Sequence, residues 1–161
     1  MCRTVRVWVG FVAWIGRCQP SDYRAIVARF VIDAPSLLHI VANDVRIGAG
    51  HQVVAPKLIR SQALTLLLDA VQRGDLSEKL ALQHHERLTE LKMRLLGDRV
   101  SRRTAWRIAR EQGWDTTYDA EYLAVAKLQA DALITVDPAM ATKAQGIVSV
   151  APLDALTADR H

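Results

Sequence analysis

The sequence predicts an α/β fold in which helices cover both faces of a mainly parallel sheet. Short apolar, β-branched runs alternate along the chain with stretches of helical periodicity. Parallel strands need long crossover connections, usually helices, so this alternation is typical of a parallel sheet. The chain has 161 residues, is 50% hydrophobic and shows no repeat or Gly/Ser linker, which favours one compact domain.

The first predicted element is a strand at 30–33, because Phe30-Val31-Ile32 is apolar and contains two β-branched residues. Asp33 ends the run, and Pro35 then favours a helix start. The same periodicities predict the remaining elements in chain order: helices near 35–46, 57–73 and 77–92, a short strand around 92–96, helices near 101–112 and 119–129, a strand at 132–136, a short helix from 138 and a final strand at 147–150.

Helical spacing of leucines in the segment 57–73 predicts a buried stripe, with Arg60 and Gln72 left in water. The stripe consists of Leu64, Leu67, Leu68 and Val71. In the helix near 101–112, the spacing of Trp106 to its alanine neighbours predicts a core position for this tryptophan.

Three aspartates stand at the joints between predicted elements. Asp33 and Asp137 each follow an apolar strand, and Pro138 suits the first residue of the next helix. Asp119 suits the N-cap or first turn of a helix rich in small residues. Taken singly, Asp119 is equally explained as a helix cap, and Asp137 as the start of a turn. Together, three acids at such joints indicate one site for a divalent metal.

The order of these motifs resembles the PIN-domain nucleases, and most closely the bacterial toxins of VapC type. The motifs are Asp33 after a short N-terminal strand, Tyr118-Asp119-Ala120 at a helix start and Leu133-Ile134-Thr135-Val136-Asp137 after that helix. The resemblance runs from about Arg29 to Leu156, and its most specific part is 115–137.

The resemblance implies a three-layer α/β/α domain whose acidic cluster holds Mg²⁺ or Mn²⁺ and hydrolyses RNA phosphodiester bonds. The implied ligands are Asp33, Asp119 and Asp137, and Thr135 would orient the site by hydrogen bonding. The family also implies a toxin that is held inactive by a cognate antitoxin and is homodimeric. The second and third helices of such toxins contribute to the antitoxin groove.

One position departs from the family pattern. Gln62 stands where the family has a fourth acid, a glutamate. A glutamine offers a carbonyl oxygen but carries no charge and cannot take a proton, so we expect weaker metal binding and slower cleavage, or none. Glu121 points about 200° round the helix from Asp119, and Asp44 lies late in the first helix, so neither replaces the missing acid.

Two functions from different classes follow. The first is the metal-dependent endoribonuclease toxin, which the three aspartates favour. The second is a PIN-like module that binds antitoxin or RNA without efficient cleavage, which Gln62 favours. A phosphatase with an aspartyl nucleophile is not expected, because such enzymes need a second aspartate two residues after the first, and Asp33 is followed by Ala34-Pro35.

The predicted domains are an N-terminal extension at 1–28, the PIN domain at 29–157 and a tail at 158–161. Residues 1–29 hold five arginines and one acid, so of the chain's 21 basic and 17 acidic residues, 16 of each remain for the rest. The pI near 9.4 is therefore no sign of nucleic-acid binding by the whole domain. A family member normally begins just before its first strand, so a start at Val27, read from a non-AUG codon, is one hypothesis for the natural product.

The apolar stretch Val7–Gly16 is too short to span a membrane and is followed by no small-x-small cleavage site. Cys2 and Cys18 both lie in the extension, so the domain needs no disulfide and fits a reducing cytoplasm. The five histidines show no zinc-binding pattern.

One local concentration of positive charge remains in the domain. It contains six arginines within 17 residues, opposed only by Asp98: Arg94, Arg99, Arg102, Arg103, Arg107 and Arg110. This cluster is either a phosphate-binding patch or a solvated helix face without a partner.

Overall fold

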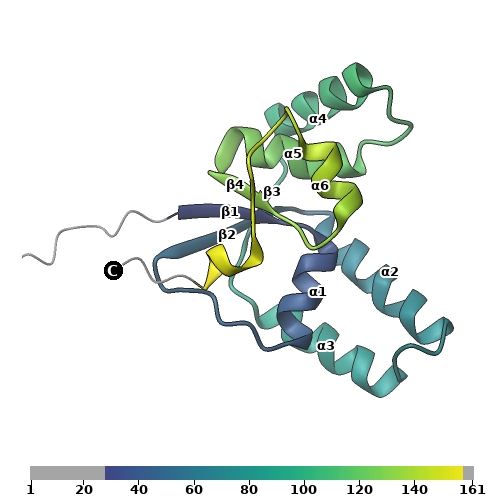
Figure 1. The fold of residues 1–161 in the computed structure, drawn as a ribbon. Helices are drawn as coiled ribbons and strands as arrows, with labels where there is room; N and C mark the ends of the chain where they lie inside the picture. Colours follow the sequence, from purple (N-terminus) through teal and green to yellow (C-terminus); the bar gives the residue numbers. More distant parts are fainter. Residues whose placement is uncertain (1–27, 158–161) are drawn as a thin grey trace, which may run out of the picture.

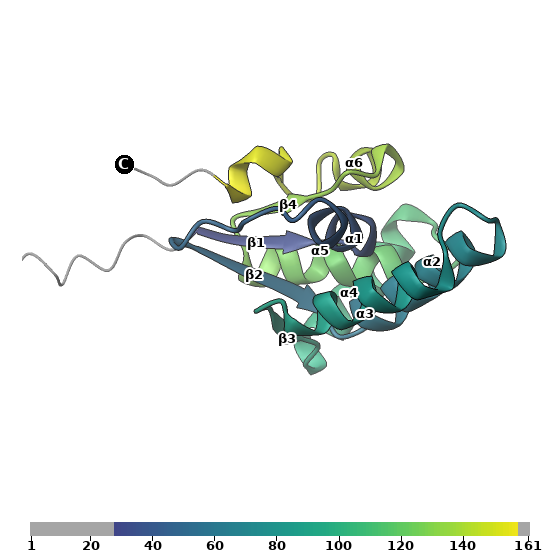
Figure 2. The ribbon, with the colours of Figure 1, turned by 90° about the horizontal axis from the view of Figure 1, so that it is seen from below.

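The computed structural model describes residues 28–157 and contains a five-stranded, fully parallel sheet in the order β3-β2-β1-β4-β5. The strands are β1 (Ala28–Ile32), β2 (His51–Pro56), β3 (Arg94–Leu96), β4 (Ala132–Ile134) and β5 (Val150–Ala151). The helices are α1 (Ala34–Ala42), α2 (Ile59–Gln72), α3 (Glu78–Glu90), α4 (Arg99–Gln112), α5 (Tyr118–Gln129) and α6 (Pro138–Ala144), followed by a 3-10 turn at Leu153–Leu156. The α/β class and the parallel sheet are confirmed, and the arrangement is consistent with three layers (Figures 1 and 2).

The order in which strands are added to the sheet reverses between β1 and β4. From β1 it moves outward to β2 and β3, then returns to pair β4 on the other side of β1 and continues to β5. Phe30 is therefore the partner of both Val53 in β2 and Ala132 in β4. Such a switch point opens a crevice outside the carboxyl ends of the two central strands, where parallel α/β folds bind ligands. Asp33 follows β1 and Asp137 follows β4 at this point.

The helix α5 packs directly against β1, β2 and β4 and carries α4 on its other side (Figure 1). Every residue from Ala120 to Ala126 is buried except Glu121, which is half-buried. Three of the buried residues are alanines that allow close approach on two sides: Ala120, Ala124 and Ala126. On the other flank, α1, α2 and α3 pack against one another. This packing holds the first turn of α5 over the end of β1.

The strand β2 was not predicted from the sequence. Val53, Val54, Ala55 and Pro56 are all buried, because β2 lies inside a sheet that is covered on both faces. Such a strand shows no polar alternation, and its proline obscured it further. Pro56 is tolerated because it is the last residue of the strand, and the ladder to β3 continues through the N–H of Lys57, which donates to the carbonyl of Leu96 (3.0 Å).

Several observed element boundaries differ from the predicted ones. The strand predicted at 147–150 is largely wrong, because Ile147 and Val148 form a turn in which both N–H groups donate to the carbonyl of Ala144 (3.0 and 3.1 Å). Strand β4 stops at Ile134, two residues before the prediction. Helix α1 ends at Ala42 rather than 46, and α4 begins at Arg99 rather than 101 because Asp98 caps it.

Three predicted core side chains lie at the surface instead. Trp106 is 63% exposed, and Leu64 and Leu68 are 49% and 56% exposed, whereas Leu67 is buried as expected. Arg60 and Gln72 are exposed, as predicted. The predicted stripe on α2 included too many buried residues. Only one side of α2 packs against α1 and α3, and no part of residues 28–157 covers its other side.

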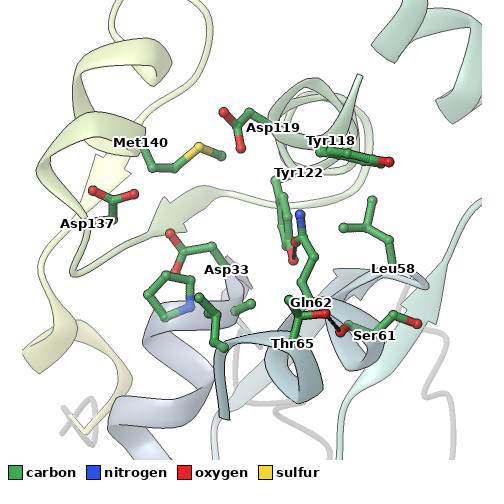
Figure 3. A pocket seen from close by; sticks show the side chains of 13 residues that line it. Asp33, Leu58, Ser61, Gln62, Thr65, Tyr118, Asp119, Tyr122, Asp137 and Met140 are labelled. Carbon is green, nitrogen blue, oxygen red and sulfur yellow. Dashed lines mark hydrogen bonds between the residues drawn. The ribbon is translucent and has the colours of Figure 1, made fainter. Parts of the chain in front are cut away.

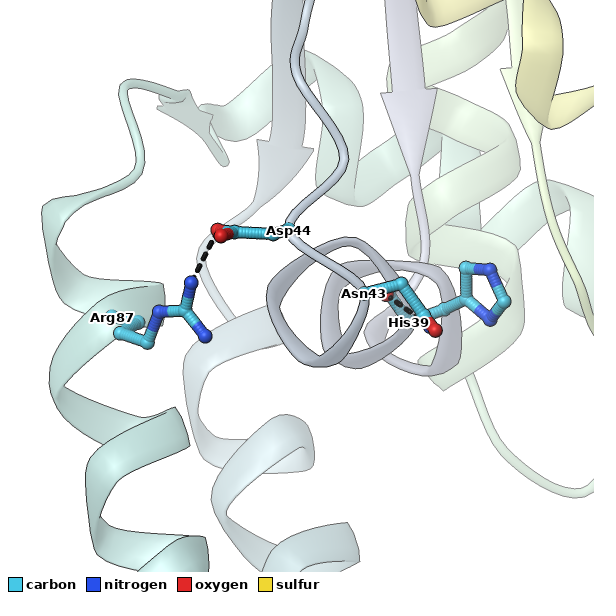
Figure 4. A network of polar contacts seen from close by, with 4 residues as sticks. All are labelled: His39, Asn43, Asp44 and Arg87. Carbon is cyan, nitrogen blue, oxygen red and sulfur yellow. Dashed lines mark hydrogen bonds and ion pairs between the residues drawn. The ribbon is translucent and has the colours of Figure 1, made fainter.

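Asp44 lies away from the carboxyl edge of the sheet, as expected. It adopts a left-handed backbone conformation (φ 54°) just after α1, and its carboxylate pairs with the guanidinium of Arg87 on α3 (Figure 4). Beside it, the amide of Asn43 donates to the carbonyl of His39 (2.9 Å) and closes the end of α1. This network joins α1 to α3 and has no part in the candidate site.

Ala28, which had been assigned to the N-terminal extension, already belongs to β1. The rest of that extension, including both cysteines, and the tail at 158–161 lie outside the described residues. None of the helices in residues 28–157 is long and apolar enough to cross a membrane.

Candidate functional site

A cavity of about 530 Å³ opens at the carboxyl ends of β1 and β4, between α1, α2, α5 and α6 (Figure 3). The sequence-predicted residues Asp33, Gln62, Asp119 and Asp137 all line it. Figure 3 shows the three carboxylates around one open space, with Met140 between Asp119 and Asp137. The structure therefore brings together the acids that come from three separate segments.

Asp33 forms the floor of this cavity and is only 3% exposed. It is also the N-cap of α1, since its Oδ1 accepts the backbone N–H of Ser36 (3.0 Å). Burial raises the pKa of this carboxyl, the hydrogen bonds from Ser36 and Thr135 oppose the rise, and the negative charge of Asp137 adds to it. A buried carboxylate of this kind favours any cation that reaches it.

Thr135, for which the resemblance implies an orienting role, forms hydrogen bonds with the segments after β1 and β4. Its hydroxyl donates to Oδ2 of Asp33 (2.5 Å), and its oxygen accepts the backbone N–H of Asp137 (3.0 Å). One side chain thus fixes the distance between the segments that follow β1 and β4.

Ser36 is a residue of the site that the sequence reasoning missed. Its hydroxyl donates to Oδ1 of Asp33 (2.5 Å), and its oxygen accepts the backbone N–H of Val136 (3.0 Å). Ser36 is fully buried, so both contacts are shielded from water. The spacing Asp-x-x-Ser at a helix start was a local signal, but the contact to Val136 depends on strand pairing.

Asp119 lies in the first turn of α5, one residue after the first helical position, Tyr118. Its carboxylate forms an ion pair with Lys143 on α6, which was not among the predicted residues. The ammonium of Lys143 also lies over the ring of Trp114, 5.3 Å from the ring centroid. Lys143 is therefore held at the edge of the cavity by an acid and an aromatic face.

Asp137 has a structural role in addition to its place in the cavity. It is the N-cap of α6, because its Oδ1 accepts the backbone N–H of Ala139 (2.9 Å), and Pro138 follows as expected. Its capping contact uses one carboxylate oxygen, and the other has no hydrogen bond within the described residues. Capping and cation binding by Asp137 are thus compatible.

Gln62 points into the cavity from α2 and contacts α5 (Figure 3). Its Oε1 accepts a hydrogen bond from the hydroxyl of Tyr122 (2.5 Å). Burial and the charges of Asp33 and Asp119 raise the pKa of Tyr122, so the phenol stays protonated and remains a donor. At the position where the family pattern has an acid, this chain has a neutral, hydrogen-bonded pair.

Glu121 does not enter the site, as its helical position predicted. It is half-buried away from the cavity, which raises its pKa, while the nearby guanidinium of Arg102 lowers it.

The chemistry of the donors suits a hard divalent cation, because carboxylates are the ligands that Mg²⁺ and Mn²⁺ prefer. Within residues 28–157, however, no three His, Cys, Asp or Glu side chains lie close enough together to form a ready-made metal cluster. Asp119 faces Lys143 rather than the other two acids. An ion shared by all three carboxylates would compete with Lys143 for the charge of Asp119, whose Oδ2 forms the ion pair.

Family models and curated proteins give no match to this chain. Among solved structures, the chain is similar to the crystal structure of PAE2754 from Pyrobaculum aerophilum, with a TM-score of 0.62 and 23% sequence identity. The match covers 81% of this chain and 94% of that one. At this identity the likeness shows the α/β fold.

Proposed function

We propose that the protein is a metal-dependent endoribonuclease of the PIN-domain family, the toxin of a VapC-type pair. The observation that carries this proposal is the convergence of Asp33, Asp119 and Asp137 on one cavity at the switch point of a parallel sheet. Two of these carboxylates are anchored by hydrogen bonds that fix their orientation.

Asp33 and Asp137 would hold Mg²⁺ or Mn²⁺, with Asp119 as a third ligand. Such an ion, when bound, polarises a phosphate and lowers the pKa of a coordinated water. Ser36 and Thr135 donate to Asp33 and hold both of its oxygens in place. An anchored ligand loses little side-chain entropy on binding an ion, which favours affinity.

Lys143 supplies positive charge at the same edge of the cavity. Its ammonium pairs with Asp119 and would contact a phosphate of the substrate there. Tyr118, which lines the cavity and is exposed, offers an aromatic face for a base of the RNA.

A second function, binding of antitoxin or RNA without efficient cleavage, is favoured by the Gln62–Tyr122 pair. The Oε1 of Gln62 accepts from the phenol with one of its two lone pairs, so this side chain adds no charge to the metal site and its oxygen is shared with Tyr122. The two functions share one scaffold and differ in the strength of the site.

The surface of α2 and α3 supports an antitoxin partner. Leu64 and Leu68 on α2 and Leu82 on α3 are each about half exposed and line one apolar hollow. Exposed apolar clusters of this kind mark interaction surfaces. The homodimer and the cytoplasmic location remain part of the same proposal.

Cleavage of an RNA substrate by the full chain with Mg²⁺ or Mn²⁺, and with EDTA as the blank, tests the proposal. Asp33→Asn should abolish cleavage, whereas Asp154→Asn, which removes an exposed acid outside the cavity, should not. Cleavage that appears only in Gln62→Glu would favour the binding module. Cleavage in none of these proteins, or equal cleavage by Asp33→Asn, would contradict the nuclease.

A further inference from the structure

The outer face of α4 carries an exposed tryptophan among arginines. At 100° per residue, these side chains fall within roughly 100° of one another on the helix. They are Arg99, Arg103, Trp106, Arg107 and Arg110, and all are exposed. The buried residues of α4 lie on the opposite side, facing α5.

The positive charges on this face destabilise α4. The first turn of α4 contains no acid, and Arg99 stands at its first position, where the helix dipole disfavours positive charge. Arg99 and Arg103, and again Arg103 and Arg107, are four residues apart, a spacing at which like charges destabilise a helix by roughly 0.2–0.5 kcal/mol per pair. Within residues 28–157, none of these arginines has an ion-pair partner. Binding of an anionic partner would therefore relieve the repulsion between these arginines.

Trp106 provides an exposed aromatic ring among these arginines. With Arg103 and Arg107 it lines a shallow hollow of about 420 Å³, which Val100 and Thr104 complete. An exposed indole between guanidinium groups can stack on a base while the arginines contact the flanking phosphates. A second protein copy is disfavoured as the occupant, because two such faces would bring arginines together.

A short connection links the end of α4 to the cavity. Gly113, in a left-handed conformation (φ 67°), ends α4, and residues 114–117 lead to Tyr118 and Asp119, which line the cavity at the start of α5. An RNA chain longer than the cavity would be expected to follow this connection toward Arg110 and Trp106.

We propose that the face formed by Arg99, Arg103, Trp106, Arg107 and Arg110 is a second contact site for single-stranded RNA, in which Trp106 stacks on a base. This inference rests on the proposed function, because it extends the contact with the same substrate beyond the phosphate that is cut.

Fluorescence anisotropy with a labelled, unstructured RNA of about 12 nucleotides tests it. The full chain is used in EDTA, so that binding is measured without cleavage. Trp106→Ala should raise the Kd about 5- to 100-fold, and Trp106→Tyr, which keeps an aromatic face, should change it far less. Arg103→Gln with Arg107→Gln should reduce the slope of log Kd against log salt by about 1.4, since each phosphate contact on single strands contributes about 0.7.

The matched control is Arg73→Gln, which removes an exposed arginine whose guanidinium pairs with Asp75 (2.9 Å), and which should leave the Kd unchanged. An unchanged Kd in Trp106→Ala would overturn the inference. So would a change in oligomeric state, measured by light scattering, without a change in RNA affinity, because the face would then be an interface between copies.

Measuring RNA binding and RNA cleavage separately distinguishes a failure of this inference from a failure of the proposed function. Weaker binding in Trp106→Ala, with no metal-dependent cleavage by the parent, would support the face and contradict the nuclease. Cleavage by the parent that is lost in Asp33→Asn, with equal RNA binding by Trp106→Ala, would support the nuclease and overturn the face.

Discussion

Lys143 forms an ion pair with Asp119, which lines the cavity, so one carboxylate of the predicted metal site already has a cationic partner within the chain. The pair joins α5 to α6, and the ring of Trp114 holds the ammonium from the other side. A metal that recruits Asp119 therefore competes with Lys143. The competition is modest, because both side chains are about 40% exposed and water screens the attraction.

Lys143→Met should bind Mn²⁺ about 2- to 5-fold more tightly than the parent, because an exposed pair of this kind is worth up to about 1 kcal/mol and the competing cation is gone. Isothermal titration calorimetry of the full chain measures the change. Lys127→Met, which removes an exposed lysine at the far end of α5, is the control and should bind as the parent does. Weaker binding in Lys143→Met would show that Lys143 does not oppose the metal.

Gln62→Glu should strengthen Mn²⁺ binding by about tenfold, because it adds a charged oxygen ligand to the cavity. The same change should lower the melting temperature of the metal-free protein, since it adds a negative charge near Asp33 and Asp119. Thermal melts with and without Mn²⁺ check both effects. Gln72→Glu, at an exposed position of the same helix, makes the same change of charge and should show neither.

Tyr122→Phe should reduce the free energy of unfolding by about 1 kcal/mol, because it removes the hydroxyl that donates to Oε1 of Gln62. The cost stays low because Gln62 lines the cavity, where water can replace the phenol. Urea unfolding measures it, with Tyr118→Phe, at an exposed tyrosine, as the control within about 0.5 kcal/mol of the parent. Equal loss in both variants would contradict a specific role for the pair.

Asp33→Asn should raise the melting temperature of the metal-free protein at pH 7. The pKa of Asp33 is raised from 3.8, chiefly by burial, so the folded protein binds more protons than the unfolded chain, and stability falls as pH rises through that window. Asparagine removes the buried charge and still serves as an N-cap, but its amide nitrogen cannot accept the hydrogen bond from Thr135, which reduces the gain. The advantage of asparagine should disappear well below pH 3.8, where the parent carboxyl is protonated in both states.

Asp98→Asn provides the opposite control for this pH dependence. Hydrogen bonds from Ser101 lower the pKa of Asp98, so its charge contributes stability that is present at neutral pH and is lost as pH falls through the lowered pKa. Melting curves from pH 3 to 8 should therefore show opposite signs for the two N-caps. The same sign in both would contradict the assigned environment of Asp33.

Leu67→Ala should cost about 2–5 kcal/mol, whereas Leu68→Ala should stay within about 0.5 kcal/mol of the parent, because only Leu67 is buried. Urea unfolding compares the two. A large loss in Leu68→Ala would mean that Leu68 is covered in solution, as expected for a homodimer that uses this surface; sedimentation at two concentrations then shows whether the variant has lost self-association.

Local signals in the sequence located two of the acids with little help from the fold. Asp33 and Asp137 each follow a run predicted to be a strand and precede a proline-containing helix start, and the structure adds that both are the N-caps of those helices. The same rules missed β2, because a strand buried on both faces shows no alternation and Pro56 resembled a break. They also placed Trp106 in the core, because helical spacing gives the direction of a side chain but not what covers it.

The sequence by itself determined the α/β class, the two strand-end aspartates and the neutral Gln62, because each depends on residue type and short-range spacing. Only the tertiary structure decided that Tyr122 uses the oxygen of Gln62, that Lys143 pairs with Asp119, and that Ser36 and Thr135 clamp Asp33. Apart from Ser36, which lies three residues from Asp33, these partners are 24 to 102 residues apart in sequence. Contacts over such separations arise from strand order and helix packing, which no local pattern of residues encodes.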